Sequence, residues 1–190
     1  RTICRCHPDD CIREALWLLS PNSEAWLNQT TNFARSNGLM SIIGYIVGIG
    51  DRHPSNILVM KGTGNVVHID FSDCFEKASL RPYVHETVPF RLTRMIVRAL
   101  GSSGVNGVFS MTAEYVMKLM RRNKDALLAF LDIFVQDPIT DTIWYKNAVD
   151  IPKYDGEPGA KGSMLKRAIG RVNDKLTGIE FDGVKMNEHE

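Results

Sequence analysis

The chain has 190 residues, of which 44% are hydrophobic and 24% charged, the proportions of a folded globular protein. Its 23 Lys and Arg against 22 Asp and Glu leave a net charge of +1, which gives no reason to expect binding to nucleic acid or an anionic membrane. The longest apolar stretch, residues 38–50, is too short and too glycine-rich for a transmembrane segment of about 20 residues, and we expect none. Four cysteines are too few for a disulfide scaffold at this length and favour a reducing compartment.

Hydrophobic periodicity predicts a mainly helical chain with one β-hairpin near its middle. The predicted helices cover residues 11–19, 24–47, 92–100, 113–120, 127–135 and 163–177. In the second of these, residues 30–32 and Gly38 are candidate interruptions. Two β-branched runs, 56–60 and 66–70, flank a turn and form the predicted hairpin. Because a lone hairpin cannot bury a face by itself, we expect it to pack against the helices.

Two segments lack any periodicity. Residues 71–90 contain Pro82 and Pro89 and are expected to form a long loop, and loops of that length are usually functional. Residues 136–162 contain three prolines and several glycines and are expected to be a surface connection. The polar tail after residue 177 is expected to fray.

The densest group of polar residues lies at the end of the second helix and in the hairpin, in the stretches GIGDRHPSN (48–56) and HIDF (68–71). Phosphoryl transfer from ATP needs a carboxylate that orients the attacking hydroxyl, and an Asn and an Asp that hold magnesium on the phosphates. In protein kinases the catalytic Asp and the metal-binding Asn lie five positions apart, as Asp51 and Asn56 do here. The hairpin should return Asp70 to the side of Asn56, and these oxygen ligands suit magnesium.

Each aspartate alone has an ordinary structural interpretation, since Asp51 is suited to a turn and Asp70 to the end of a strand. The joint pattern of D-R-H-x-x-N, a hairpin and I-D-F is much rarer by chance, and it favours the functional interpretation. Arg52 is expected to pair structurally rather than to react. His68 is equally well explained as a core histidine with satisfied hydrogen bonds.

DRHPSN together with HIDF is similar to the phosphatidylinositol-3-kinase superfamily, which contains lipid kinases and the large related Ser/Thr protein kinases. Longer stretches most resemble its target of rapamycin branch. These stretches are LWL (16–18), SPNSEAW (20–26), GYIVGIGDRHPSN (44–56), VPFRLTRM (88–95) and DKLTG (174–178). The resemblance covers nearly the whole chain and is weakest in residues 1–14 and 136–162.

The resemblance implies roles for four residues. Asp51 is then the catalytic aspartate and His53 contacts the transferring phosphate, while Asn56 and Asp70 hold Mg²⁺ and through it bind ATP. Residues 51–56 become the catalytic loop and residues 70–90 the activation segment. The family's DFG is Asp-Phe-Ser at 70–72 here, and the loss of glycine restricts the loop backbone but leaves the metal ligand in place.

The fold implied by the resemblance is the C-lobe of a protein-kinase-like PI3/PI4-kinase domain over residues 1–190, mainly α (an α+β kinase lobe) with a central hairpin. No glycine-rich phosphate loop and no strand lysine precede the catalytic loop, the first residue is Arg1, and no FATC segment follows the helix at 163–177. We therefore expect a partial catalytic domain without its N-lobe, which alone binds ATP weakly and turns over little.

The acceptor is expected to be a protein hydroxyl. Lipid kinases of the superfamily hold a phosphorylated headgroup with basic residues of the activation segment. In this chain that segment has balanced charges: Lys77, Arg81 and His85 against Asp73, Glu76 and Glu86. A lipid kinase, a DNA-damage-response relative and a non-catalytic docking module stay as alternatives. The resemblance also implies growth and nutrient signalling, assembly with the subunits of a large complex, and a cytoplasmic or endomembrane location.

Zinc is the other metal to consider. Cys4, Cys6, His7 and Cys11 are spaced C-x-C-H-x₃-C. Structural zinc sites usually combine C-x₂-C with a second, distant pair, so we do not expect zinc here.

Overall fold

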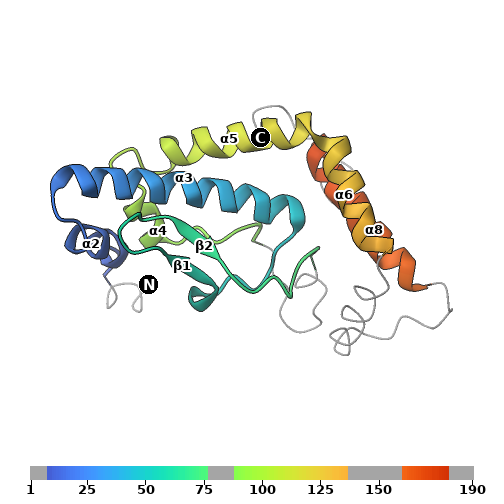
Figure 1. Cartoon of the computed structure of the whole chain (residues 1–190), viewed down its shortest axis with the longest axis horizontal. Coiled ribbons are helices and arrows are strands. Elements are labelled where there is room, and N and C mark those ends of the chain that lie inside the picture. Colours follow the sequence, from blue (N-terminus) through green and yellow to red (C-terminus); the bar gives the residue numbers. More distant parts are fainter. Residues whose placement is uncertain (1–7, 77–87, 137–159, 180–190) are drawn as a thin grey trace. The chain divides into compact units, whose positions relative to one another are not determined.

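The computed structural model describes residues 8–76, 88–136 and 160–179, which form helices and one two-stranded sheet (Figure 1). The helices are α2 (Cys11–Leu18), α3 (Ser23–Val47), α4 (Arg94–Ala99), α5 (Val108–Arg122), α6 (Lys124–Gln136) and α8 (Ala160–Thr177). The strands are β1 (Ile57–Val59) and β2 (Val66–His68), and short 3-10 helices occur at Pro54–Asn56 and Gly104–Asn106. Most of the predicted loop at 71–90, of the connection at 136–162 and of the tail lies outside the described residues.

The chain folds into two compact units. The first unit contains Arg1–Tyr45, Asp51–Phe71 and Val88–Val116, and the second contains Ile46–Gly50, Ser72–Thr87 and Met117–Glu190. In the second unit α6 and α8 pack side by side (Figure 1). Among the helices in the described ranges, none combines the length and the apolar character that crossing a membrane requires.

The core of the first unit receives buried apolar side chains from α2, α3, the hairpin, α4 and the start of α5. The buried members are Leu16, Phe33, Ala34, Val66, Ile96, Ala99, Leu100 and Phe109. Removing these side chains from water is the main term that stabilises the unit. Since the β2 residue Val66 belongs to this cluster, the hairpin packs against the helices as predicted.

Polar contacts fix the hairpin along α3. The Asn32 side-chain amide donates to the Thr63 carbonyl at 3.0 Å, and the Val66 amide donates to the Ser36 hydroxyl at 2.8 Å. Gly64 has a φ of 76° and lies so close to α3 that a Cβ atom there would stand 2.4 Å from the Gln29 carbonyl oxygen. The turn therefore needs glycine both for its backbone conformation and for its contact with the helix.

The candidate interruptions of α3 are wrong, because the helix is continuous from Ser23 to Val47. The Thr31 hydroxyl donates to the Leu27 carbonyl at 2.8 Å, which accommodates a β-branched polar residue within the helix. Gly38 is a packing glycine, since a Cβ atom there would stand 2.7 Å from the Phe109 carbonyl oxygen. A small residue here lets α3 and the start of α5 approach closely.

Most of the predicted helix starts are shifted in the structure. α3 begins one residue early, α5 begins at Val108 rather than at residue 113, and α6 begins at Lys124 rather than at residue 127. α4 begins at Arg94 rather than at residue 92, because Thr93 has an extended backbone and its hydroxyl accepts from the Ile96 amide. Leu92 nevertheless packs against the core from its position before the helix. α8 begins at Ala160, three residues ahead of the predicted start, and ends at Thr177 as predicted.

Candidate functional site

The antiparallel hairpin brings the two halves of the motif together. Its register pairs Ile57 with His68, and one step further the Ile69 amide donates to the Asn56 carbonyl at 3.0 Å. Asn56 therefore lies opposite Ile69, and Asp70 is the next residue along the chain. This is the return of Asp70 toward Asn56 that the sequence predicts.

Asn56 also organises the loop that contains Asp51. Its side chain is buried, with 6% of the residue exposed, and its Nδ2 donates to the Asp51 main-chain carbonyl at 2.9 Å. Because the amide nitrogen makes this bond, the side-chain oxygen is the atom of Asn56 suited to a cation. The five-residue spacing of Asp51 and Asn56 thus corresponds to a direct contact within one tight loop.

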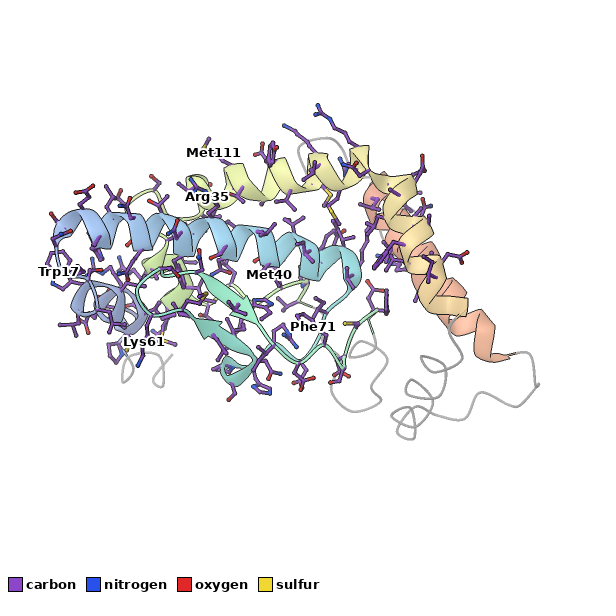
Figure 2. The ribbon with its side chains drawn as sticks, in the orientation of Figure 1. Trp17, Arg35, Met40, Lys61, Phe71 and Met111 are labelled. Carbon is purple, nitrogen blue, oxygen red and sulfur yellow. The ribbon has the colours of Figure 1, made fainter. Side chains whose placement is uncertain are left out.

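Arg52 connects this loop with the end of the hairpin. Its guanidinium donates to the Ile69 carbonyl at 2.9 Å and also to the Asp70 carbonyl, and it lies 5.8 Å from the centre of the Phe71 ring. Figure 2 labels Phe71 just beyond the end of β2. The Arg52 carbonyl in turn accepts from Arg91 at 3.4 Å. The predicted pairing role of Arg52 is confirmed: a planar, five-donor group is suited to holding two neighbouring carbonyls.

Both aspartates of the motif have strained backbones. Asp51 has a φ of 56° and Asp70 a φ of 58°, in the left-handed region that non-glycine residues seldom adopt. Such conformations cost of order 1–3 kcal/mol each and persist where surrounding contacts over-determine them. Here the contacts are those of Asn56 and Arg52. Ser72 is not among the described residues with positive φ, so a serine is accommodated there without the strain that only a glycine would relieve.

The candidate residues differ in their access to solvent. His53 and Asp70 are exposed, Asp51 is half-buried, and Asn56 is buried. His68 is half-buried on the inner face of β2, and its Nδ1 is a buried atom without a hydrogen-bond partner among the described residues. The interpretation of His68 as a fully satisfied core histidine is therefore wrong. Burial, and then the nearby charge of Arg52, lowers the pKa of His68 from its usual 6.5, which favours the neutral ring.

A metal ion at this site would have few protein ligands. Within residues 8–76, 88–136 and 160–179, no three His, Cys, Asp or Glu side chains gather as a metal site. Magnesium needs no such cage, since it is usually held by one or two protein oxygens together with phosphates and water. An Asp carboxylate and an Asn oxygen are hard ligands of that kind. Of the zinc candidates, Cys4, Cys6 and His7 lie outside the described residues, and Cys11 is an exposed free thiol.

The outer face of the hairpin is apolar and exposed, which the sequence analysis missed. Ile57 and Val66 point toward the core, whereas Leu58 is 46% exposed and its cross-strand partner Val67 is 38% exposed. Ile69, opposite Asn56, is exposed as well. A solvent-facing hairpin side normally has polar residues. The uninterrupted apolar run ILVM at 57–60 was the signal in the sequence, because a strand with one wet face should alternate.

The chain is similar to known proteins in both sequence and structure. A family model described as phosphatidylinositol 3- and 4-kinase matches residues 5–143. The chain belongs to this family. The target of rapamycin homolog of Caenorhabditis elegans is 48% identical over 180 residues, and the match covers 90% of this chain and 7% of that protein. Serine/threonine-protein kinase mTor of Drosophila melanogaster is 45% identical over 177 residues, with 93% and 7% covered.

Solved structures of related proteins have a similar fold. The FAT and kinase domain of CtTel1 is similar with a TM-score of 0.69 and 31% identity, over 87% of this chain and 11% of that chain. The predicted fold class, a mainly helical kinase C-lobe with one central hairpin, is confirmed, as is the resemblance to target of rapamycin kinases. The chain spans about 7% of the length of these curated relatives.

Proposed function

We propose that the chain supplies the catalytic C-lobe of a Ser/Thr protein kinase of the target of rapamycin type, which transfers the γ-phosphate of ATP to protein hydroxyls. The observation that supports this most is the joint placement of Asp51, Asn56 and Asp70. The Asn56 side chain is hydrogen-bonded to the Asp51 carbonyl. In the hairpin Ile69 lies opposite Asn56, and Asp70 is the residue after Ile69. Relatives named as serine/threonine-protein kinases support the reaction class.

In this proposal residues 51–56 are the catalytic loop and residues 70–90 the activation segment. The Asp51 carboxylate orients the attacking hydroxyl and accepts its proton. His53, exposed two residues further on, donates a hydrogen bond to the transferring phosphate. The Asn56 side-chain oxygen and the Asp70 carboxylate would hold Mg²⁺, which would offset the negative charge of the ATP phosphates. Arg52 fixes the backbone that presents Asp70.

The outer face of the hairpin is the proposed platform for the adenine ring. Leu58, Val67 and Ile69 are exposed on it, and Ile69 lies opposite the proposed magnesium ligand Asn56. A flat, weakly polar ring placed there would cover apolar surface that otherwise faces water, while its phosphates reach the metal ligands. This accounts for an apolar surface that has no role in the core.

A protein acceptor is favoured over a lipid acceptor by the balanced charge of residues 71–90, since a phosphorylated inositol headgroup needs an excess of basic residues. The proposal extends to growth and nutrient signalling, to work within a large kinase complex, and to a cytoplasmic or endomembrane location. Vesicles containing a phosphorylated phosphatidylinositol test the lipid alternative. We expect no binding, and saturable binding would favour the lipid kinase.

Calorimetry of the 190-residue chain with ATP, in the presence and absence of Mg²⁺, tests the site. We expect magnesium-dependent binding in the millimolar range, worth about −4 kcal/mol. The affinity is low because these residues include no glycine-rich phosphate loop and no strand lysine ahead of Asp51. Asp70→Ala should abolish the magnesium dependence.

The matched control is Asp125→Ala, which removes an exposed carboxylate from the first turn of α6. This variant should bind Mg·ATP as the wild type does. If the wild type, Asp70→Ala and Asp125→Ala all behave alike, the hairpin does not hold nucleotide and the docking module becomes the better proposal.

A further inference from the structure

The segment before Asp51 and the segment after Phe71 are joined by backbone hydrogen bonds. Within the second unit, the Gly50 amide donates to the Asp73 carbonyl at 2.7 Å, the Phe75 amide to Val47 at 2.9 Å, and the Glu76 amide to Gly48 at 2.9 Å. We call this arrangement of residues 47–50 and 73–76 the clasp. All the proposed catalytic and metal-binding residues lie in the part of the chain between residues 50 and 73. The clasp therefore closes the base of the loop that contains them.

The clasp is closely packed and strained. Gly48 has a φ of 67°, and a Cβ atom at this position would stand 2.6 Å from the Glu76 amide nitrogen. Phe75 and Glu76 have φ values of 62° and 57°, which are costly for residues with side chains. A conformation of this kind needs contacts that maintain it. The three backbone bonds are one such set of contacts, and the Glu76 side chain makes another.

The Glu76 carboxylate binds two cations of α8. Its Oε2 lies 3.5 Å from Arg171 Nε, and its Oε1 pairs with Lys175 Nζ. Arg171 and Lys175 are four residues apart and therefore share one face of the helix. Lys175 is only 5% exposed. A buried ammonium strongly requires a counter-charge, so α8 and Glu76 are held together by more than a surface ion pair.

We propose that Glu76 is a positioning residue through which α8 keeps the clasp closed and so fixes the chain that presents Asp51 and Asp70. Gly50 directly precedes Asp51, and Asp73 follows Asp70 by three residues, so movement at the clasp is transmitted along a few bonds of backbone. The effect on nucleotide binding rests on the proposed function. The coupling of α8 to the clasp does not, and it can be measured separately.

Hydrogen exchange on the 190-residue chain measures the coupling. We expect Glu76→Gln to accelerate exchange at the amides of residues 50, 75 and 76 while the amides within α3 keep their protection. Because Glu76→Gln leaves Lys175 buried without a counter-charge, the variant has a risk of unfolding. Glu76→Gln with Lys175→Met removes the carboxylate and the more deeply buried of its two cations, while Arg171 keeps its hydrogen bond to the Ile179 carbonyl. This double variant should fold, as circular dichroism will check, yet still lose protection at the clasp.

Calorimetry with Mg·ATP then measures positioning. We expect the double variant to raise the Kd about tenfold, the lower end of the effect of removing groups that orient metal ligands. Glu76→Asp keeps the charge and should restore most of the affinity. Gly170→Ala is the control on α8, because a Cβ atom there would touch nothing within 4 Å, and it should change neither exchange at the clasp nor the affinity for Mg·ATP.

Unchanged exchange at the clasp in the folded double variant would overturn the proposal, because α8 would then not hold the clasp. Faster exchange with unchanged Mg·ATP affinity would overturn it too, since the clasp would then not position the site. If the wild type binds no Mg·ATP, the proposed function fails, and the exchange result by itself decides whether α8 and the clasp are coupled.

Discussion

Arg52 lies at the centre of the DRHPSN motif, and the contacts of its guanidinium are structural. It lies between Asp51 and His53, yet it is 6% exposed and its guanidinium binds two main-chain carbonyls of the hairpin end. A buried carbonyl that loses its donor costs about 1–3 kcal/mol, which is comparable to the strain at Asp70. The hydrogen bond from Arg52 thus contributes to maintaining the left-handed backbone of Asp70.

Arg52→Lys tests this role at the level of one residue. Lysine keeps the charge but lacks the planar fork, so one of the two carbonyls should lose its partner. We expect the free energy of unfolding to fall by about 1–3 kcal/mol, measured by urea denaturation. The affinity for Mg·ATP should fall as well.

The control for Arg52→Lys is Arg35→Lys. Arg35 is exposed on α3, where Figure 2 labels it, and the substitution should leave stability and binding within error. Equal stability of Arg52→Lys and the wild type would mean that the bidentate contact contributes nothing to holding Asp70.

At the scale of elements, the docking of the hairpin turn on α3 places the candidate site in the first unit. Gly62 and Gly64 both have positive φ values, 84° and 76°. A Cβ atom would touch nothing within 4 Å at Gly62, whereas at Gly64 it would stand 2.4 Å from the Gln29 carbonyl oxygen. Alanine substitutions at the two glycines therefore separate the free-energy cost of a left-handed backbone from the cost of a clash with α3.

Gly62→Ala should therefore destabilise the chain by roughly 1–2 kcal/mol, the cost of a left-handed backbone alone. Gly64→Ala should cost at least about 1 kcal/mol more, because the added methyl group forces the turn away from α3. Urea denaturation of both variants gives the difference. Equal losses would show that the turn can move off α3 without penalty.

The two faces of the hairpin offer a second comparison between elements. Leu58 lies on the outer face and is 46% exposed. The next residue, Val59, lies on the opposite side of β1 and is 40% exposed. Leu58→Ser should raise the Kd for Mg·ATP about fivefold, the effect of losing roughly 40 Å² of apolar contact at about 25 cal/mol per Å². The measurement is calorimetry at constant magnesium.

Val59→Ser removes a similar amount of exposed apolar surface from the side of β1 that does not face the proposed nucleotide. It should leave the Kd unchanged. If both serine variants bind alike, the adenine ring does not lie on the outer face and the platform must be sought elsewhere.

For the molecule as a whole, nucleotide binding should appear as a gain in stability. A ligand that binds only the folded chain adds RT ln(1 + [L]/Kd) to the free energy of unfolding, about 1.4 kcal/mol at 10 times its Kd. We expect Mg·ATP in excess to raise the thermal midpoint, and EDTA to remove most of the rise, because the proposed protein ligands reach the phosphates through the metal. A rise that survives EDTA would indicate binding without the site at Asn56 and Asp70.

Local patterns were enough to predict the helices, the hairpin and the spacing of the motif. Asp51 and Asn56 are five residues apart in a short loop, and Asp70 lies across a two-stranded hairpin. The distances between the three residues therefore depend on few backbone torsion angles. The family resemblance rests on the same stretches. Helix boundaries and interruptions were predicted less well. The Thr93 hydroxyl caps α4 and Gly38 packs against the start of α5, and helix propensity reveals neither contact.

Contacts between distant residues were not predictable in this way. The bond from Arg52 to Asp70, the approach of Gly64 to α3 and the pairing of Glu76 with Lys175 join positions 18, 35 and 99 residues apart, by subtraction of their sequence numbers. No periodicity or motif encodes such pairs, because they arise only when separate elements pack and their side chains compete for the same partners. The sequence therefore predicts which chemistry the chain is built for, and the folded structure identifies the residues that hold its parts in place.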